Sequence, residues 1–224
     1  MGSLEGVFVD FYGTVAGGDR QAVYDVCQAV VDDYGLRADA ADLASQWGDC
    51  YFSAIESLDG QAFRLLRELE HETLIETIRP LGVEIDAAPY ITQLNAYLAQ
   101  PALFDEVHEV LDGIRVPVCI VSNADERELR MAIAHHGLHV AHVVTSEFAR
   151  SYKPEARIFR AALEVTGWSA DRVLHVGDSL HSDVGGAHNA GLKAAWVSRS
   201  DRIKDIGTEQ PDFTWHDLRP LLAL

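Results

Sequence analysis

The chain has 224 residues, of which 48% are hydrophobic, so it is long and apolar enough to form one α/β domain with an insertion or two small domains. Its formal net charge of −17 argues against nucleic acid and anionic membranes as partners. We see no apolar run near the ~20 residues of a membrane span and no secretory signal, and the three cysteines form no metal motif, so we expect a cytoplasmic protein.

The first predicted element is a buried strand at residues 7–9, Val-Phe-Val. A short apolar run that follows a glycine and is rich in β-branched and aromatic residues is typical of a parallel strand. Asp10 comes directly after it, at the strand end where open α/β sheets bind ligands. We therefore expect Asp10 to be a nucleophile or a metal ligand, with the hydroxyl of Thr14 fixing its carboxylate. The alternative is that Asp10 is a loop residue that caps the next helix.

Residues 16–98 are predicted to form a helical block. A flexible stretch at 16–19 is followed by apolar residues at helical spacing. We predict helices at 20–34, 38–58, 61–78 and 85–97, and no strand among them. We interpret this block as a bundle that is inserted after the first strand and folds over it.

From residue 104 onward, strand patterns and helix patterns alternate. We predict further strands at 116–121, 142–145, 172–176, 193–197 and 213–214. Helices are predicted at 105–113, 125–136, 154–166, 183–190 and 218–224. This alternation indicates βαβ units and hence an α/β fold with a parallel sheet.

Reactive side chains follow several of these strands. They are Asp10, Ser122, Asn123, Lys153, Asp178 and Asp183. Because parallel strands share one carboxyl edge, we expect these groups to converge. The carboxylates would repel one another unless a cation lay between them, and an all-oxygen acidic cluster suits Mg²⁺. Lys153 and Ser122 would then bind the remaining oxygens of a small anionic substrate.

The same residues match the motifs of a known family, in the same order along the chain. The motifs are Asp10-Phe11-Tyr12-Gly13-Thr14, Val121-Ser122-Asn123, Tyr152-Lys153-Pro154, and Gly177-Asp178-Ser179 followed by Asp183. On these motifs the chain resembles the haloacid dehalogenase superfamily of hydrolases. The resemblance implies a Rossmann-like core of residues 1–15 and 99–224 with a helical cap of residues 16–98.

The resemblance also implies roles for the motif residues. Asp10 would be the nucleophile and form a covalent aspartyl intermediate. Ser122 would bind the transferred group, and Lys153 would neutralise Asp10 and the substrate. Thr14 and Asn123 complete the catalytic set. The implied Mg²⁺ ligands are Asp10, Asp178, Asp183 and the backbone carbonyl of Tyr12.

Tyr12 is where the chain departs from the phosphatases of this superfamily, which usually have a second Asp there as general acid. Tyrosine at this place, and the Tyr152-Lys153-Pro154 motif, resemble the 2-haloacid dehalogenases, whose halide leaves without a proton. Those enzymes need no metal, however, and their cap has an arginine just after a Trp, where this chain has Gly48. Because Asp178 and Asp183 are both kept, we favour Mg²⁺-dependent phosphate hydrolysis over dehalogenation.

Three questions stay open at this level. If the reaction needs a general acid, Tyr12 or His181 is the candidate, unless the leaving group is already good. A non-catalytic binding member of the fold is the third functional hypothesis. The sequence also does not distinguish a monomer from a homodimer.

Overall fold

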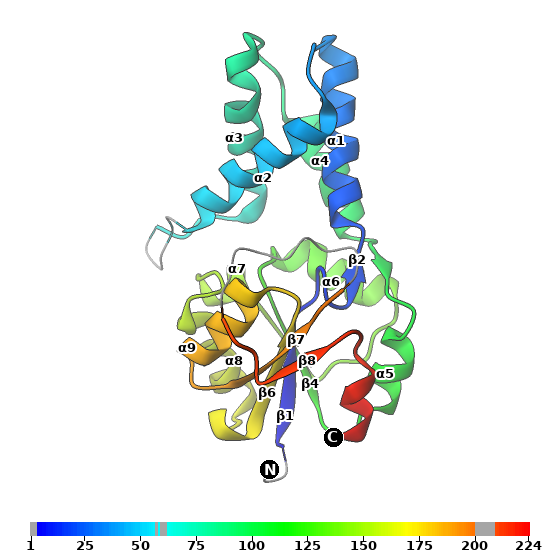
Figure 1. Ribbon diagram of the computed structural model, residues 1–224, viewed down its shortest axis with the longest axis vertical. Coiled ribbons are helices and arrows are strands. Elements are labelled where there is room, and N and C mark those ends of the chain that lie inside the picture. The colour runs from blue at the N-terminus through cyan, green and yellow to red at the C-terminus, as the bar shows by residue number, and fades with distance from the viewer. Residues whose placement is uncertain (1–3, 57, 59–61, 200–208) are drawn as a thin grey trace.

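The computed structural model describes residues 4–56, 58, 62–199 and 209–224. A six-stranded sheet runs through its lower half in Figure 1, in the order β5-β4-β1-β6-β7-β8. The strands are Gly6–Val9 (β1), Val118–Ser122 (β4), His142–Thr145 (β5), Val173–Gly177 (β6), Lys193–Val197 (β7) and Phe213–Trp215 (β8). All neighbouring strands pair in parallel, which confirms the predicted α/β fold. β1 lies between β4 and β6, so the residue after it lies in the middle of the carboxyl edge.

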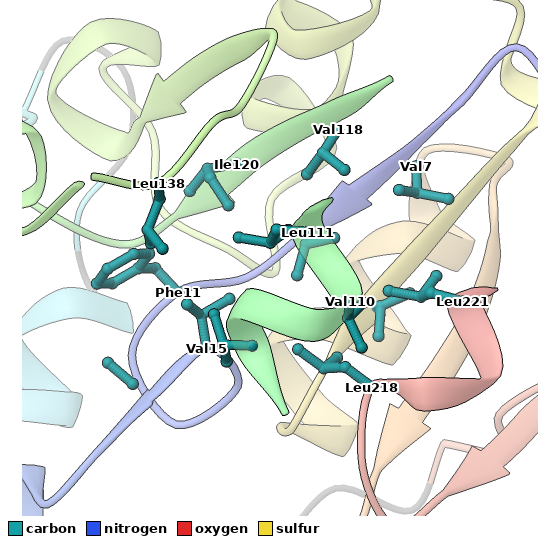
Figure 2. Close-up of a cluster of buried hydrophobic side chains, with 14 of the residues drawn as sticks. Val7, Phe11, Val15, Val110, Leu111, Val118, Ile120, Leu138, Leu218 and Leu221 are labelled. Carbon is teal, nitrogen blue, oxygen red and sulfur yellow. The ribbon is translucent and has the colours of Figure 1, made fainter. Parts of the chain in front are cut away.

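Helices cover both faces of this sheet. Val7 of β1 belongs to an apolar cluster with Val110 and Leu221, which lie in the segments Val107–Gly113 (α5) and Arg219–Ala223 (η4) (Figure 2). Phe8 belongs to a second cluster with residues of Ala156–Thr166 (α8) and Gly186–Asn189 (α9). Because side chains alternate along a strand, these clusters lie on opposite faces. Coverage of both faces explains why β1 reads as one apolar run.

The remaining helices of this half are short. They are Glu126–His135 (α6), Ser146–Ala149 (α7), the 3₁₀ turn Ala170–Arg172 (η2) and the π-helical turn Leu180–Gly185 (η3). The sequence pattern did not predict α7. The helix predicted at 183–190 instead begins with the π-helical turn η3 and continues as α9. The segment predicted as a closing helix at 218–224 is the 3₁₀ turn η4.

The predicted helical block forms helices that lie together above the sheet in Figure 1. They are Asp19–Tyr34 (α1), Ala40–Glu56 (α2), Leu66–Ile78 (α3), Arg79–Leu81 (η1, a 3₁₀ turn) and Ala88–Leu98 (α4). Their apolar side chains form a cluster drawn from this segment alone. Treating residues 16–98 as a cap distinct from the core remains our proposal.

The third helix begins later than predicted. Of the predicted span 61–78, residue 61 lies outside the described part of the chain, and residues 62–65 are not helical. The backbone N–H groups of Leu66 and Arg67 donate to the carboxylate of Asp125, over 2.9 and 3.1 Å. Asp125 precedes α6, so a residue distant in sequence caps the first turn of α3, and no local pattern indicates that start.

A small antiparallel ladder forms where flexible residues were predicted. Ala16–Gly17 (β2) pairs with Ala102–Leu103 (β3), so residues 16 and 17 form a strand and not the flexible stretch that was predicted. Strands of two residues are too short for an alternating pattern, and their partners are far apart in sequence. A Cβ on Gly17 would come 2.7 Å from the ring of Phe104, so glycine lets this ring pack closely against the ladder. The chain leaves the sheet region and returns to it through this ladder.

Candidate active site

The carboxylate of Asp10 lies at the carboxyl end of the central strand and is buried. Its backbone N–H donates to the carbonyl of Val176 on β6 over 2.9 Å, which fixes the residue against the neighbouring strand. Lys153 Nζ lies 2.6 Å from Asp10 Oδ1. The hydroxyl of Thr14 lies 3.3 Å from Asp10 Oδ2 and 3.1 Å from Asp178 Oδ1. Residues from three separate motifs therefore meet around Asp10.

Asp183 is held from three sides. Its Oδ1 lies 2.7 Å from Lys153 Nζ and 2.9 Å from Nε2 of His175, and its Oδ2 accepts the backbone N–H of Ser179 over 3.0 Å. A Cβ on Gly177 would lie 2.1 Å from Asp183 Cγ. Gly177 is therefore required for Asp183 to pack against the end of β6.

Asn123 and Ser122 lie at the end of β4, the other neighbour of β1. Asn123 Oδ1 accepts the backbone N–H of Lys153 over 2.7 Å, and its Nδ2 donates to the carbonyl of Lys153 over 3.2 Å. Asn123 therefore fixes the backbone of Lys153. Ser122 is the last residue of β4 and is buried, 1% exposed. Its predicted role in binding the transferred group remains a proposal.

The charges of the buried groups act on one another. Burial raises the pKa of Asp10 and the charge of Asp183 adds to this, although Lys153 opposes both. Burial would also raise the pKa of Asp183. Lys153 and His175 outweigh that effect and hold the pKa of this carboxyl below its usual value. Burial would lower the pKa of Lys153, but Asp10 and Asp183 outweigh it and raise that pKa. Lys153 is thus a stable cation beside more carboxylates than it can neutralise.

A hard divalent cation fits this donor set. One ligand atom each from Asp10, Asp178 and Asp183 lies within 4.8 Å of the others, and all three side chains are at most 4% exposed. Two like charges at such a distance repel by about 3 kcal/mol at an effective dielectric constant of 20. Buried carboxylate oxygens in this arrangement suit Mg²⁺. These three side chains would hold the ion, and its charge would offset that of an anionic substrate; the Tyr12 carbonyl as a further ligand remains a prediction.

The two proton donors suggested by the sequence each have a partner outside the acidic cluster. The hydroxyl of Tyr12 donates to the carbonyl of Leu98, at the end of α4, over 2.8 Å. Burial, followed by the charge of Glu128, raises the pKa of Tyr12. His181 lies in η3 with its side chain 43% exposed, and its Nε2 is 3.8 Å from Glu56 of α2. The hydroxyl of Tyr12 therefore links the loop after β1 to the end of α4, and its predicted role as a proton donor remains a proposal.

Two residues near the site were not identified as functional from the sequence. His175 was interpreted as a hydrogen-bonded core residue, and its partner is Asp183. The signal available was its place on β6, two residues before Gly177 and hence on the same face of the strand. Arg199 follows β7, and its Nη2 donates to the carbonyl of Thr14 over 2.6 Å. No motif or spacing indicated that contact.

Relatives of known activity match this chain over its whole length. An (S)-2-haloacid dehalogenase of Pseudomonas sp. (strain YL) is 25% identical over 229 residues, which cover 100% of this chain and 95% of that protein. The structure of an L-2-haloacid dehalogenase from Xanthobacter autotrophicus has a TM-score of 0.80 at 22% identity and covers 99% of this chain and 98% of its own. The latter similarity establishes the fold.

Similarity to a phosphatase is higher but local. A glyceraldehyde 3-phosphate phosphatase of Pyrococcus abyssi (strain GE5 / Orsay) is 44% identical over 55 residues, which cover 25% of this chain and 23% of that protein. The full-length matches therefore do not support our preference for phosphate hydrolysis over dehalogenation. A family model described as haloacid dehalogenase-like hydrolase matches residues 4–191. With the fold and these matches together, the chain belongs to the haloacid dehalogenase-like hydrolases.

Proposed function

We propose that the chain hydrolyses a small anionic substrate through a covalent intermediate on Asp10, with a 2-haloacid as the first candidate substrate. The observation that carries this choice is the placement of Tyr12. Its hydroxyl donates to the carbonyl of Leu98, which supports a reaction that needs no proton from Tyr12. A halide leaves with its electron pair and needs no proton. The full-length relative from Pseudomonas supports the same choice.

The contacts of Asp10 support the following course for the proposed dehalogenation. An oxygen of the Asp10 carboxylate attacks the carbon that bears the halogen, so a C–O bond forms as the carbon–halogen bond breaks and halide departs. Lys153, 2.6 Å from Asp10 Oδ1, orients the carboxylate for that attack. Water then adds to the carbonyl carbon of the aspartyl ester and releases a 2-hydroxyacid and a proton. Asp10 is restored as carboxylate.

Mg²⁺-dependent phosphate hydrolysis is the second candidate, and the cluster of Asp10, Asp178 and Asp183 favours it. With Lys153 as the neighbouring ammonium group, this cluster repels an anionic substrate unless a cation is bound. Phosphate oxygens together with one or two carboxylates are typical Mg²⁺ ligands. The same Asp10 oxygen would attack phosphorus, so that an O–P bond forms as the P–O bond to the leaving alcohol breaks. Water would then hydrolyse the aspartyl phosphate, release inorganic phosphate and restore the carboxylate.

The helices above the sheet also bear on this choice. Trp47 of α2 is buried, and its indole N–H donates to the hydroxyl of Thr73 over 3.0 Å. Gly48 follows it, so this position supplies no cation for a substrate carboxylate. Arg64 is bound to Glu72 over 2.6 Å. Neither of these two positions therefore offers an unpaired cation for the carboxylate of a 2-haloacid, and Lys153 or a bound ion is our candidate partner for it.

One panel separates the candidates. Halide release from L-2-chloropropionate and phosphate release from p-nitrophenyl phosphate are each measured with Mg²⁺ and with EDTA. Asp10→Asn is the control for the nucleophile. Halide release that persists in EDTA supports the first candidate, and phosphate release that requires Mg²⁺ supports the second. Failure of both reactions over a range of substrates would overturn both candidates in favour of a non-catalytic binding protein.

The setting of the reaction is also a proposal. Within the described part of the chain, no helix combines the length and apolarity needed to cross a bilayer. We retain the expectation of a cytoplasmic protein with a small-molecule substrate and with no nucleic-acid or membrane partner. A monomer and a homodimer both remain compatible with it.

A further inference from the structure

Arg199 is a buried cation behind the nucleophile loop. Its Nη2 donates to the carbonyl of Thr14 over 2.6 Å, and its Nη1 lies 2.7 Å from Glu106 Oε1. Its Cζ lies 3.7 Å from the centroid of the Phe104 ring. The side chains of Arg199 and Glu106 are only 8% and 5% exposed. One guanidinium thus holds a carbonyl, a carboxylate and an aromatic face at the same time.

These partners belong to the two places where the chain crosses between the sheet and helices α1–α4. Thr14 lies two residues before β2, and Phe104 directly follows β3. The two crossings are hydrogen-bonded to each other, since the backbone N–H of Phe104 donates to the carbonyl of Val15 over 3.1 Å. The hydroxyl of Thr14 lies at hydrogen-bonding distance from both Asp10 and Asp178. A contact to the Thr14 carbonyl therefore acts on the same residue that joins these two carboxylates.

We propose that Arg199 is a positioning residue for the candidate active site. It fixes the carbonyl of Thr14 so that the Thr14 hydroxyl stays between Asp10 and Asp178. Through its contact with Phe104 it also holds the two chain crossings, before β2 and after β3, together. The inference rests on the proposed function in one respect, namely that Asp10 is the nucleophile. Arg199 itself touches neither the nucleophile nor the substrate in this role.

The geometry requires arginine and not only a positive charge. A guanidinium is planar and offers several N–H donors in fixed directions, whereas a lysine ammonium is a compact point charge that cannot stack on a ring in the same way. Glu106 is buried, and its Oε1 also accepts the backbone N–H of Leu218 over 3.2 Å. Removal of the charge would leave a buried carboxylate without compensation and destabilise the fold. Arg199→Lys keeps the positive charge but removes the planar set of guanidinium N–H donors. This variant therefore tests the geometry of the contact separately from its charge.

The kinetic test compares Arg199→Lys with Arg219→Lys. Arg219 also binds two carboxylates, Glu109 and Asp217, but it is 49% exposed and is part of the surface. In Arg199→Lys we expect kcat on the substrate found active to fall about 10–100-fold, with KM changed less than about 3-fold, as is typical of misplaced reacting groups. Arg219→Lys should leave both constants unchanged. An unchanged kcat in Arg199→Lys would overturn the proposal.

A second readout needs no substrate. Amide hydrogen exchange is measured for peptides that cover residues 11–17 and 100–106, with residues 173–177 of β6 as the internal reference. We expect faster exchange in Arg199→Lys at the two crossings and no change in β6, because the positioning is local. Exchange that rises equally in β6 would mean general destabilisation and would also overturn the proposal. If the unaltered protein released neither halide nor phosphate, the proposed function would fail, and hydrogen exchange alone would decide the role of Arg199.

Discussion

Among the described residues, two groups of three buried carboxylates differ in how their charges are compensated. The site carboxylates are Asp10, Asp178 and Asp183, and the interface carboxylates are Glu70, Asp125 and Glu128. Every one of these side chains is 6% exposed or less. In the site group, Lys153 lies within hydrogen-bonding distance of Asp10 and Asp183, and His175 lies within hydrogen-bonding distance of Asp183. The interface group is divided between α3 and the start of α6, and its cationic partners, Arg67 and Arg127, are 43% and 77% exposed.

The difference shows that burial alone does not decide whether a carboxylate stays charged. Buried Asp183 has a lowered pKa because Lys153 and His175 outweigh desolvation. Buried Glu70 has its pKa raised to about 8, first by desolvation and then by the charges of Asp125 and Glu128. Glu70 Oε2 and Glu128 Oε2 have no hydrogen-bond partner among the described residues. Asp183 is thus arranged to hold charge, and Glu70 is arranged to hold a proton.

The largest expected contrast is between Asp10→Asn and Asp125→Asn. Loss of the nucleophile should lower kcat at least about 10⁴-fold, as for other enzymes with a covalent intermediate. Asp125 accepts the first N–H groups of α3, so its replacement should cost about 1 kcal/mol of stability and change kcat less than about 10-fold. Steady-state kinetics and urea unfolding measure the two effects. Substantial activity in Asp10→Asn would mean that the nucleophile lies elsewhere.

Lys153→Met tests whether the ammonium group of Lys153 compensates the buried charges of Asp10 and Asp183. The change leaves Asp10 and Asp183 buried beside each other without their ammonium partner, which should cost about 3–5 kcal/mol of unfolding free energy. Urea unfolding measures the loss. Arg64→Met is the control, because Arg64 and its partner Glu72 are 37% and 52% exposed and such pairs contribute about 0–1 kcal/mol. Equal losses in the two variants would contradict the contrast between buried and exposed pairs.

The two groups of carboxylates also differ in how far the sequence predicted them. The site carboxylates follow buried strands, and a parallel sheet brings strand ends together, so the alternation of strands and helices was enough to predict their meeting. Glu70 occupies an ordinary position in a charged helix, and its burial depends on α3 packing near Asp125. The contact of Arg199 with Thr14 likewise depends on a ladder of two-residue strands. Tertiary contacts of this kind leave no periodic signal in the chain.

Glu70→Gln tests the interface group through pH. Between its usual pKa of 4.5 and its folded pKa of about 8, Glu70 is protonated in the folded state and ionised in the unfolded state. The folded state then binds more protons, so the stability of the unaltered protein falls as pH rises through this window. Between pH 5 and 8.5 it should lose about 2–4 kcal/mol more than Glu70→Gln, which has no such proton to lose.

Urea unfolding across this pH range measures the difference. Glu72→Gln, on the same helix, is the control, because the bond to Arg64 lowers the pKa of Glu72. That variant should not reproduce the flatter pH dependence. Parallel stability curves for the unaltered protein and Glu70→Gln would show that Glu70 is ionised when folded, and the contrast between the two groups would disappear.

The smallest expected effect belongs to Tyr12, which links the nucleophile loop to the end of α4. Tyr12→Phe removes the donor to the Leu98 carbonyl and should cost about 1 kcal/mol of stability. If the hydroxyl only positions the loop, kcat should change no more than about 3-fold; loss of a general acid typically costs about 10²–10⁴-fold. Measurement with L-2-chloropropionate and with an alkyl phosphate, whose alkoxide leaving group needs a proton, separates the two roles. A large fall in kcat on the phosphate ester alone would assign the proton to Tyr12 and favour phosphate hydrolysis, because halide departure has no use for it.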